Sequence, residues 1–391
     1  MSKQKRAYKY RFYPTDEQRV ILAQTFGCCR FVYNWGLHTR SFAYKEQGQK
    51  LNYNALAAML PDLKREYPWL CEVSSVPLQQ SLRHLDTAFK NLFEGRAKYP
   101  TFKKKQNAQS ATYASNAFKW ENGQLTLAKM NEPLAITFHR DLPKGCKPSS
   151  VTISKDCANR YFVSMLIEDK IEPLPVVNKM VGLDLGIKSM VALSTGESID
   201  NPKFYAKDEK CLAKAQRRHA RKKKGSKNRA KARLKVARVH ARINDQRRDY
   251  QHKLSTRIIR ENQVICIESL AVKNMVKNHK LAKAISDVGW GEFVRQLEYK
   301  SKWYGRTLVK IDRWYPSSKT CHACKHVGDS LPLDIREWVC PECGVVHDRD
   351  TNAALNILAE GLSAFACGGS VRPVRTRVRQ ATPVEAGNSR S

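Results

Sequence analysis

Four cysteines stand in two closely spaced pairs near the C-terminal end of the sequence. The pattern is Cys-x2-Cys, fifteen residues, then Cys-x2-Cys, formed by Cys321, Cys324, Cys340 and Cys343. Two such pairs can place four thiolates in a tetrahedron, the arrangement of a closed structural zinc site. Gly344 follows the second pair and suits the left-handed turn of such a knuckle, whereas Lys325 follows the first. We expect one structural Zn²⁺ here.

Three carboxylates occupy places where a charge is costly unless it binds a cation. Asp184 lies within the apolar run Val-Gly-Leu-Asp-Leu, and Glu268 ends the run Val-Ile-Cys-Ile-Glu. A third acid, Asp348 or Asp350, precedes an apolar helix, where helix capping is the alternative explanation. Acids at strand ends of an open α/β sheet commonly form a site. Together they predict a nuclease with two Mg²⁺ ions about 4 Å apart that cleaves a phosphodiester.

The composition predicts a polyanionic partner. The chain has 70 Lys and Arg against 36 Asp and Glu, a net charge of +34, while 42% of its 391 residues are hydrophobic. The basic residues are spread along the chain and not confined to one amphipathic helix, which favours nucleic acid over a membrane surface. The sequence has no apolar run of a length that spans a membrane, and no secretory signal, so we expect a cytoplasmic protein.

The remaining eight cysteines follow no paired spacing. A metal site plus ordinary thiols is typical of a cytosolic protein, so we expect these cysteines to act as small apolar fillers. They are Cys28, Cys29, Cys71, Cys146, Cys157, Cys211, Cys266 and Cys367.

One segment is far more basic than the rest. Residues 212–235 contain twelve Lys or Arg and no acid. Unbalanced like charge repels itself until phosphates neutralise it, whereas a merely solvated helix face normally mixes signs. The densest run is expected to contact a nucleic-acid backbone and comprises Arg221, Lys222, Lys223 and Lys224.

The first 180 residues predict a strand-rich module with a helical insert. Residues 7–13 alternate basic and aromatic side chains up to Pro14, as a strand would. Thr15 and Gln18 then form a capping-box pattern that opens a helix. A second apolar helix face spans 78–93, and strands are expected over 117–180.

From residue 181 the pattern changes to that of an α/β core. Short apolar strands are expected within 181–193, 264–269 and 308–311, with helices between them. One of these helices spans 291–304 and ends at Gly305. The last residues, 367–391, have few large apolar side chains and predict a disordered basic tail.

Taken together, these motifs resemble the TnpB (OrfB) family encoded by bacterial insertion sequences. The motifs that carry the resemblance are KYRFYPTDEQ, YPTFKKK, GLDLGIKS, ICIESL, WGEFVRQLEYKSKWYGR, the paired cysteines and HDRDTNAALNIL. They occur in the family's order over nearly the whole chain. The resemblance implies an RNA-guided DNA endonuclease related to type V CRISPR effectors.

The resemblance also implies an α/β multidomain fold. A RuvC/RNase H-like nuclease core would carry a zinc-ribbon insertion and follow a β-barrel wedge with a helical recognition insert. The implied parts are a wedge at 1–10 and 117–180, a recognition lobe at 11–116, a nuclease at 181–313 and 347–366, a target-nucleic-acid-binding zinc module at 314–346, and the tail.

In the family's D-x-D-x-N-A-A pattern the second acid is catalytic. The resemblance therefore assigns catalysis and Mg²⁺ binding to Asp184, Glu268 and Asp350, with Asp348 as a neighbour. The implied partners are a guide RNA and a target DNA. Protein and guide RNA would form a monomeric ribonucleoprotein in a bacterial or archaeal cytoplasm, associated with the nucleoid when active.

Sequence readout would pass largely to guide pairing, and the protein would read only a short flanking motif. Candidate readers are Tyr53, Gln79 and Gln80, because Gln can pair with adenine through two hydrogen bonds. Ordinary polar surface is the alternative for each of them.

Two other functions fit the same residues. A transposase would join strands with the same acids, and a regulator would bind nucleic acid without cleaving it. The presence of all three acids argues against the regulator, because a chain without catalysis would be free to lose them.

Overall fold

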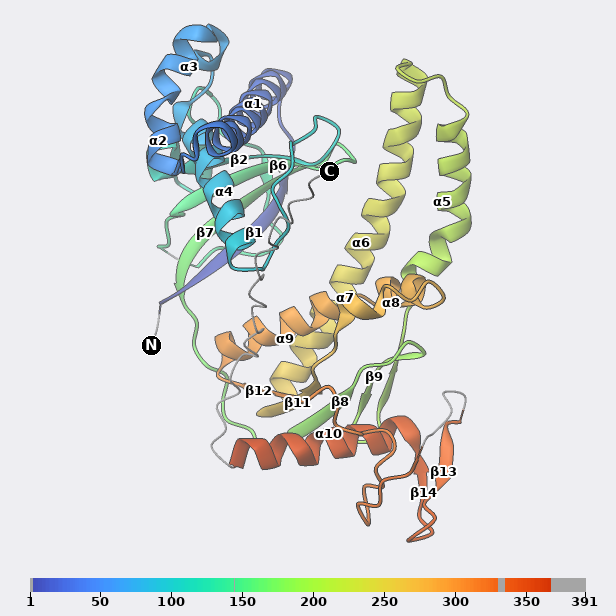
Figure 1. Ribbon diagram of the computed structural model, residues 1–391. Coiled ribbons are helices and arrows are strands. Elements are labelled where there is room, and N and C mark those ends of the chain that lie inside the picture. The colour runs from blue at the N-terminus through green and yellow to red at the C-terminus, as the bar shows by residue number, and fades with distance from the viewer. Residues whose placement is uncertain (1–2, 144, 330–334, 367–391) are drawn as a thin grey trace, which may run out of the picture. The chain divides into compact units, whose positions relative to one another are not determined.

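The computed structural model describes residues 3–143, 145–329 and 335–366 (Figure 1). It divides into two compact units, one of Met1–Glu172 with Asp208–Asp245 and one of Pro173–Lys207 with Gln246–Ser391. Both units mix helices and strands, so the expected multidomain α/β class is confirmed. No helix among the described residues is both long and apolar enough to cross a membrane. The predicted tail at 367–391 lies outside the described residues.

An antiparallel five-stranded sheet is the scaffold of the first unit. Its order is β2-β6-β7-β1-β5, and β3 and β4 form a separate hairpin. Along β1 the aromatic residues Tyr8, Tyr10 and Phe12 are buried, while the basic residues between them face outward. The strands are β1 (Lys3–Phe12), β2 (Gln109–Ala114), β3 (Phe118–Glu121), β4 (Gln124–Leu127), β5 (Ile136–Thr137), β6 (Ser150–Lys155) and β7 (Tyr161–Lys170).

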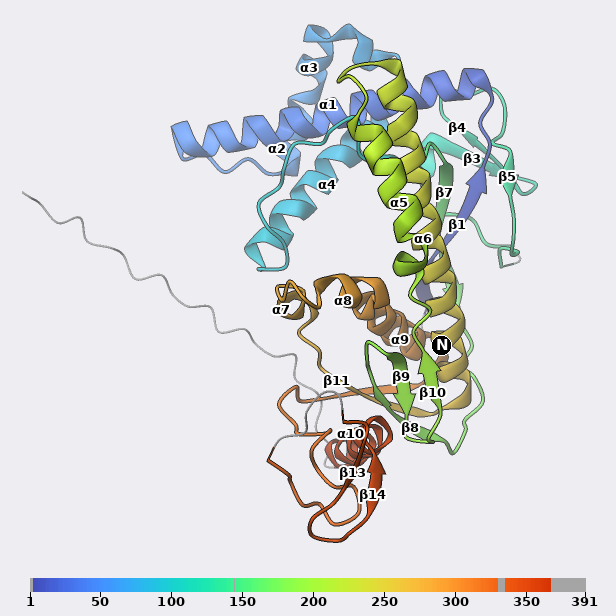
Figure 2. The same ribbon diagram turned by 90° about the vertical axis from the view of Figure 1, so that its right-hand side faces the viewer.

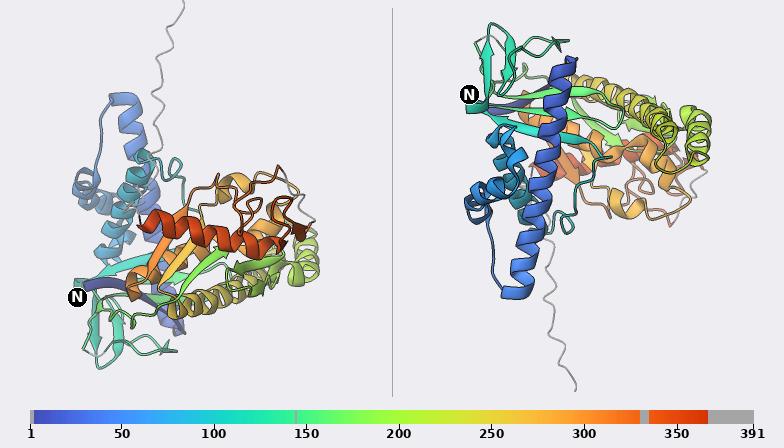
Figure 3. Two further views of the ribbon diagram at one scale, coloured as in Figure 1. Left: turned by 90° about the horizontal axis from the view of Figure 1, so that it is seen from below. Right: turned by 90° about the horizontal axis from the view of Figure 1, so that it is seen from above.

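The helices between β1 and β2 belong to the first unit. They are α1 (Asp16–Gln47), α2 (Tyr53–Ala58), α3 (Leu60–Glu66) and α4 (Ser75–Phe93). The capping box is confirmed, because Thr15 and Gln18 each accept a hydrogen bond from the other's backbone N–H. Helices α1 and α4 pack against each other and against β2 (Figure 3). The apolar face expected on α4 is buried.

A long helical hairpin carries the basic segment. It consists of α5 (Phe204–Ala220) and α6 (Lys227–Glu261), which run side by side (Figure 2). An Asp208–Arg242 ion pair joins the two helices. Within the first unit, Arg160, directly before β7, pairs with Asp245 of α6.

A mixed five-stranded sheet is the scaffold of the second unit. Its order is β10-β9-β8-β11-β12. Strand β11 pairs in parallel with β8 and β12, whereas β9 pairs antiparallel with β8 and β10. The strands are β8 (Met180–Asp184), β9 (Ser189–Leu193), β10 (Ser198–Asp200), β11 (Val264–Glu268) and β12 (Thr307–Ile311). The α/β core expected from residue 181 onward is therefore seen, with its strands at the expected places.

Helices cover both faces of this second sheet. They are α7 (Val272–Met275), α8 (Ala282–Val288), α9 (Trp290–Tyr304) and α10 (Arg349–Ala366). Figure 1 shows α10, in red, along one face of the sheet and α9 with the end of α6 along the other. Helix α9 ends at Gly305, which has φ 66°, as the sequence predicts. A two-stranded hairpin, β13 (Glu337–Val339) and β14 (Val346–Asp348), leads directly into α10.

Three expectations differ from the structure. The lobe boundary at residue 116 is misplaced, because β2 pairs with β6 and so belongs to the sheet and not to the helices. The edge strands β2 and β5 do not pair in the described part of the chain, so a closed wedge barrel is not confirmed. Residues 208–245, expected in the nuclease, group with the first unit.

The scattered cysteines differ in burial. Cys28, Cys29 and Cys266 are buried, as apolar fillers should be. Cys71, Cys157 and Cys211 are exposed, so the filler prediction is wrong for them, while Cys146 is partly buried. Cys367 lies outside the described residues.

Helix α10 packs very closely on β8 at Gly182. A Cβ atom on Gly182 would lie 2.0 Å from the Ala354 carbonyl oxygen and 2.8 Å from the Leu358 nitrogen. Both neighbours are backbone atoms, so Gly182→Ala must separate α10 from the sheet. We expect a loss of about 3 kcal/mol or more of unfolding free energy, measured by guanidinium denaturation.

The matched control is Gly291→Ala in α9. A Cβ atom there meets nothing within 4 Å, and the backbone is helical. We expect it to leave stability unchanged or to raise it by up to about 1 kcal/mol. Equal unfolding curves for the two variants would contradict the packing described here.

Candidate active site and metal centre

Asp184 and Glu268 are neighbours at one edge of the second sheet. Each is the last residue of its strand, and β8 and β11 run parallel with Leu183 opposite Ile267. The carboxyl ends of parallel strands are where sites form in open α/β sheets. Both side chains are partly buried. The structure thus brings together the two acids that the apolar strand pattern identifies.

The third acid is Asp350, in the first turn of α10. This helix packs on β8, which places its N-terminal end near Asp184. The Asp350 carboxylate accepts hydrogen bonds from Arg336 Nη1, with both oxygens 3.0 Å away. Asp348 is exposed, and its Oδ1 accepts the Thr351 backbone N–H at 2.7 Å. Asp348 therefore caps α10, and Asp350 is the acid that interacts with Asp184.

The electrostatics of Asp184 connect the three acids. Burial, followed by the negative charges of Glu268 and Asp350, raises the pKa of Asp184 to about 7, and Arg349 opposes this shift. Burial also raises the pKa of Glu268, against a hydrogen bond from Ser317. A carboxylate whose pKa is raised by neighbouring acids is stabilised in its charged form by a bound cation.

The donor set fits a hard divalent cation. Three carboxylates from three different elements offer only oxygen ligands, which Mg²⁺ prefers. Asp184 has no positive partner that outweighs its acidic neighbours. The residues present therefore suit Mg²⁺ at this edge of the sheet.

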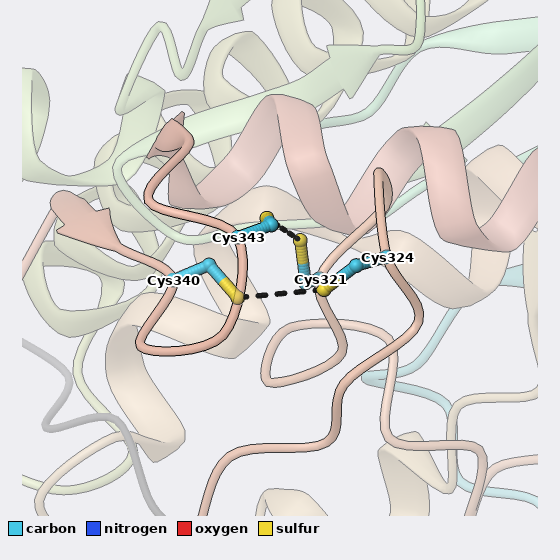
Figure 4. A group of neighbouring side chains, drawn as sticks. All are labelled: Cys321, Cys324, Cys340 and Cys343. Atoms are coloured by element: carbon cyan, nitrogen blue, oxygen red, sulfur yellow. Dashed lines mark hydrogen bonds between the residues drawn. The ribbon is translucent and has the colours of Figure 1, made fainter.

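The four cysteines form a compact thiol cluster. Their sulfur atoms all lie within 4.8 Å of one another, and among the described residues they are the one group of three or more such ligands this close together. Figure 4 shows Cys321 Sγ facing Cys343 Sγ and Cys324 Sγ facing Cys340 Sγ, each pair 3.6 Å apart. Four thiols converging in this way fit a tetrahedral Zn²⁺.

Both knuckles share one backbone geometry. Lys325 N donates to the Cys321 carbonyl at 3.0 Å, and Gly344 N donates to the Cys340 carbonyl at 2.9 Å. Lys325 has φ 66° and Gly344 has φ 71°, so the left-handed turn occurs in both. At Lys325 this conformation costs about 1 kcal/mol that glycine would not lose.

Several side chains around the sites escaped the sequence analysis. His347 Nε2 lies 3.0 Å from Cys321 Sγ, and Arg336 and Ser317 bond to Asp350 and Glu268. They carry no spacing signal, since each reaches its partner only through the tertiary fold. Their positions beside the cysteine and aspartate motifs are the one hint that the sequence offers.

The candidate base readers lie on helices that pack together. Gln79 is exposed and Gln80 is partly exposed on α4, while Tyr53 begins α2. The Arg83 guanidinium, on the same helix as the glutamines, lies 4.4 Å from the centre of the Tyr53 ring. The three candidates thus belong to neighbouring positions of the first unit, where their reading role stays a prediction.

The basic run lies in the turn between α5 and α6. Its four side chains, Arg221, Lys222, Lys223 and Lys224, are all exposed. Arg229 Nη1 donates to the Lys222 carbonyl at 2.8 Å and helps to fix this turn. The turn therefore presents a cluster of positive charge to solvent.

Family profiles match three separate parts of the chain. A profile described as "Probable transposase" (OrfB_IS605) matches residues 162–279, and one described as "Cas12f1-like, TNB domain" matches residues 290–357. A third, "Helix-turn-helix domain", matches residues 1–50. In the structure this last segment is the strand β1 followed by the single long helix α1.

Relatives and one solved structure match nearly the whole chain. A Streptomyces pristinaespiralis protein named "Putative RNA-guided DNA endonuclease" is 57% identical over 97% of this chain and 95% of its own length. Escherichia coli K12 "Putative RNA-guided DNA endonuclease InsQ" is 31% identical over 97% and 98%.

The solved structure is described as "Cryo-EM structure of the Cas12f1-sgRNA-target DNA complex". It is similar in fold, with a TM-score of 0.57 at 15% identity, over 91% of this chain and 98% of its own. Relatives this similar over nearly their full lengths, together with the OrfB profile, show that the chain belongs to the TnpB (OrfB) family of insertion-sequence proteins.

Proposed function

We propose that this protein is an RNA-guided DNA endonuclease that uses Mg²⁺ at Asp184, Glu268 and Asp350. The observation that carries the proposal is the pKa of Asp184 at the end of β8, which burial and the charges of Glu268 from β11 and Asp350 from α10 raise to about 7. Bound there, two Mg²⁺ ions would activate a water and stabilise the leaving oxygen of a phosphodiester.

Each residue of the site would have its own role in this reaction. Asp184 and Glu268 hold negative charge at fixed strand ends, and Asp350 adds a third carboxylate from the helix. Arg336 donates to Asp350 and is about two-fifths exposed, which keeps a positive charge beside the place where a phosphate would lie. The N-terminal end of α10 adds the favourable dipole that helix N-termini offer to anions.

Guide RNA and target DNA are the proposed partners. The net charge of +34 suits polyanions, and the two relatives named above are called RNA-guided DNA endonucleases. The similar solved structure is described as a complex with sgRNA and target DNA. A monomeric ribonucleoprotein in the bacterial or archaeal cytoplasm is part of the proposal, as is a short flanking motif read by Tyr53, Gln79 and Gln80.

A strand-joining transposase is the second candidate, because the family profile is described as "Probable transposase". The test is to sequence the RNA that copurifies with the protein and to incubate the complex with a matching plasmid and Mg²⁺. Double-strand breaks without joined strands support the endonuclease. Joined products, or no cleavage of a matched target, contradict it.

Removing any one of the three acids should abolish cleavage. Asp184→Ala, Glu268→Ala and Asp350→Ala each remove charge stabilisation worth several kcal/mol, which is about a hundredfold or more in rate. Target binding should be nearly unchanged, because the metal charge acts in the transition state. Cleavage rates and target affinities of the purified complexes measure both effects.

Asp348→Ala is the matched control in the same turn. It removes a helix cap worth about 1 kcal/mol and should lower activity only mildly. If Asp348→Ala abolished cleavage while Asp350→Ala did not, the assignment of the two acids would be reversed.

Loss of a zinc cysteine should unfold the zinc module alone. Cys321→Ser or Cys340→Ser removes a ligand of a closed site, in which metal binding supplies folding free energy. We expect zinc content to fall and residues 314–346 to become susceptible to proteases, while the nuclease fold survives. Exposed Cys71→Ser is the control and should keep its zinc. Wild-type protein without zinc would overturn this assignment.

The basic turn should bind phosphates without reading bases. Replacing Arg221, Lys222, Lys223 and Lys224 by Gln should weaken binding to all targets alike. The slope of the logarithm of the binding constant against the logarithm of the salt concentration should become less steep by up to about 4. The required flanking motif should not change. The measurement is affinity for matched and mismatched targets over a salt series.

A charge-preserving exchange is the control for this variant. Lysine for Arg221 and arginine for the three lysines should keep the wild-type slope. An unchanged slope in the glutamine variant would show that the turn is an ordinary solvated surface. A change in the required flanking motif would show that the turn reads bases.

A further inference from the structure

Glu268 receives a hydrogen bond from the loop that leads into the zinc module. Ser317 Oγ donates to Glu268 Oε1 at 2.7 Å, and Ser317 is only 5% exposed. A glutamate side chain has three rotatable bonds, so a single buried donor has a large share in fixing its orientation.

The serine is itself held in place by α10. Asn356 Nδ2 donates to the Ser317 carbonyl at 2.9 Å and to the Thr320 carbonyl at 2.6 Å. One turn earlier, Asn352 Nδ2 donates to the same Thr320 carbonyl at 2.8 Å. Both asparagines are almost completely buried. The loop is therefore fixed to the helix that also carries Asp350.

The same contacts reach the first zinc ligand. Asn352 Oδ1 accepts the His322 backbone N–H at 2.9 Å, directly after Cys321. Within the loop, Thr320 Oγ1 donates to the Pro316 carbonyl at 2.7 Å and closes a tight turn. The segment from Pro316 to His322 thus has both ends anchored, with the serine near one end and a zinc cysteine near the other.

We propose that Ser317 is a positioning residue for Glu268, and that Asn352 and Asn356 fix it there, so that the zinc-binding loop forms part of the nuclease site. The inference rests on the proposed function, since it assumes that Glu268 binds a divalent metal. A hydroxyl on Oε1 leaves Oε2 and a lone pair of Oε1 for the metal. Partners of this kind typically change metal affinity or activity by about 10-fold to 100-fold.

The test compares Ser317→Ala and Ser317→Thr with wild type in the guide-bound protein. For each we would measure the Mg²⁺ concentration that gives half-maximal cleavage, target affinity and zinc content. We expect Ser317→Ala to raise the half-maximal Mg²⁺ concentration about tenfold or more, with target affinity and zinc content unchanged. Threonine restores the hydroxyl and should return the Mg²⁺ dependence to within a few-fold of wild type.

Ser318→Ala is the matched control. Ser318 is the next residue in the same loop and is more exposed than Ser317. Its replacement should leave all three measurements at wild-type values, because the hydroxyl that donates to Glu268 Oε1 belongs to Ser317 and is kept.

A second readout does not need cleavage. Mn²⁺ bound by the complex can be counted by electron paramagnetic resonance, with the Glu268→Gln complex as the baseline for ions held by RNA. Wild type and Ser317→Thr should bind Mn²⁺ above that baseline at concentrations where Ser317→Ala does not.

These outcomes separate the two proposals. A wild-type complex that neither cleaves nor binds Mn²⁺ above the baseline contradicts the proposed function. A functional wild type with Ser317→Ala unchanged in both readouts overturns the positioning role. Loss of zinc or of target affinity in Ser317→Ala overturns it too, because the serine would then support only the folding of the loop. Threonine that behaves like alanine shows that the hydroxyl is not the cause.

Discussion

The partial burial of Asp184 beside two further acids is the constraint on which the candidate site depends. Burial, and then the negative charges of Glu268 and Asp350, disfavour the charged form of Asp184 and raise its pKa to about 7. The parallel pairing of β8 with β11 makes Asp184 and Glu268 neighbours, and the packing of α10 on Gly182 holds the helix that carries Asp350 against β8. Charges that oppose folding are typical of functional sites, where the rest of the core supplies the free energy that offsets them.

The zinc-binding segment has a structural connection to this site that its metal cluster alone does not reveal. Asn352 and Asn356 attach the loop before the first knuckle to α10, and Ser317 and Arg336 of the segment contact two of the three acids. A closed thiolate site contributes folding energy and no chemistry. In this protein that folding energy would order the loop that orients Glu268.

Local patterns predicted much of the fold, because they report on neighbours in the sequence. The capping box at Thr15, the stop of α9 at Gly305 and the strands ending at Asp184 and Glu268 are all seen. Long-range pairing was less predictable. Strand β2 follows the helices in the chain yet pairs with β6, so the boundary at residue 116 was misplaced. Hydrogen bonds between β2 and β5, which would close a barrel, are not seen in the described strands.

The candidate site shows the same division between local and long-range signals. An acid inside an apolar strand is visible in the sequence, because burying it is costly. The sequence pattern does not choose between Asp348 and Asp350, since either acid can cap a helix. That choice comes from the family resemblance. The structure separates them by the Asp348–Thr351 cap. Ser317 gave no signal at all, because a serine in a loop is ordinarily a surface residue.

The most direct measurement of the central claim is anomalous X-ray scattering from crystals of the guide- and target-bound protein grown with Mn²⁺ in place of Mg²⁺. The account predicts two manganese peaks, each in contact with at least two of the carboxylates of Asp184, Glu268 and Asp350. Peaks at other residues, or none at these three acids, would contradict it.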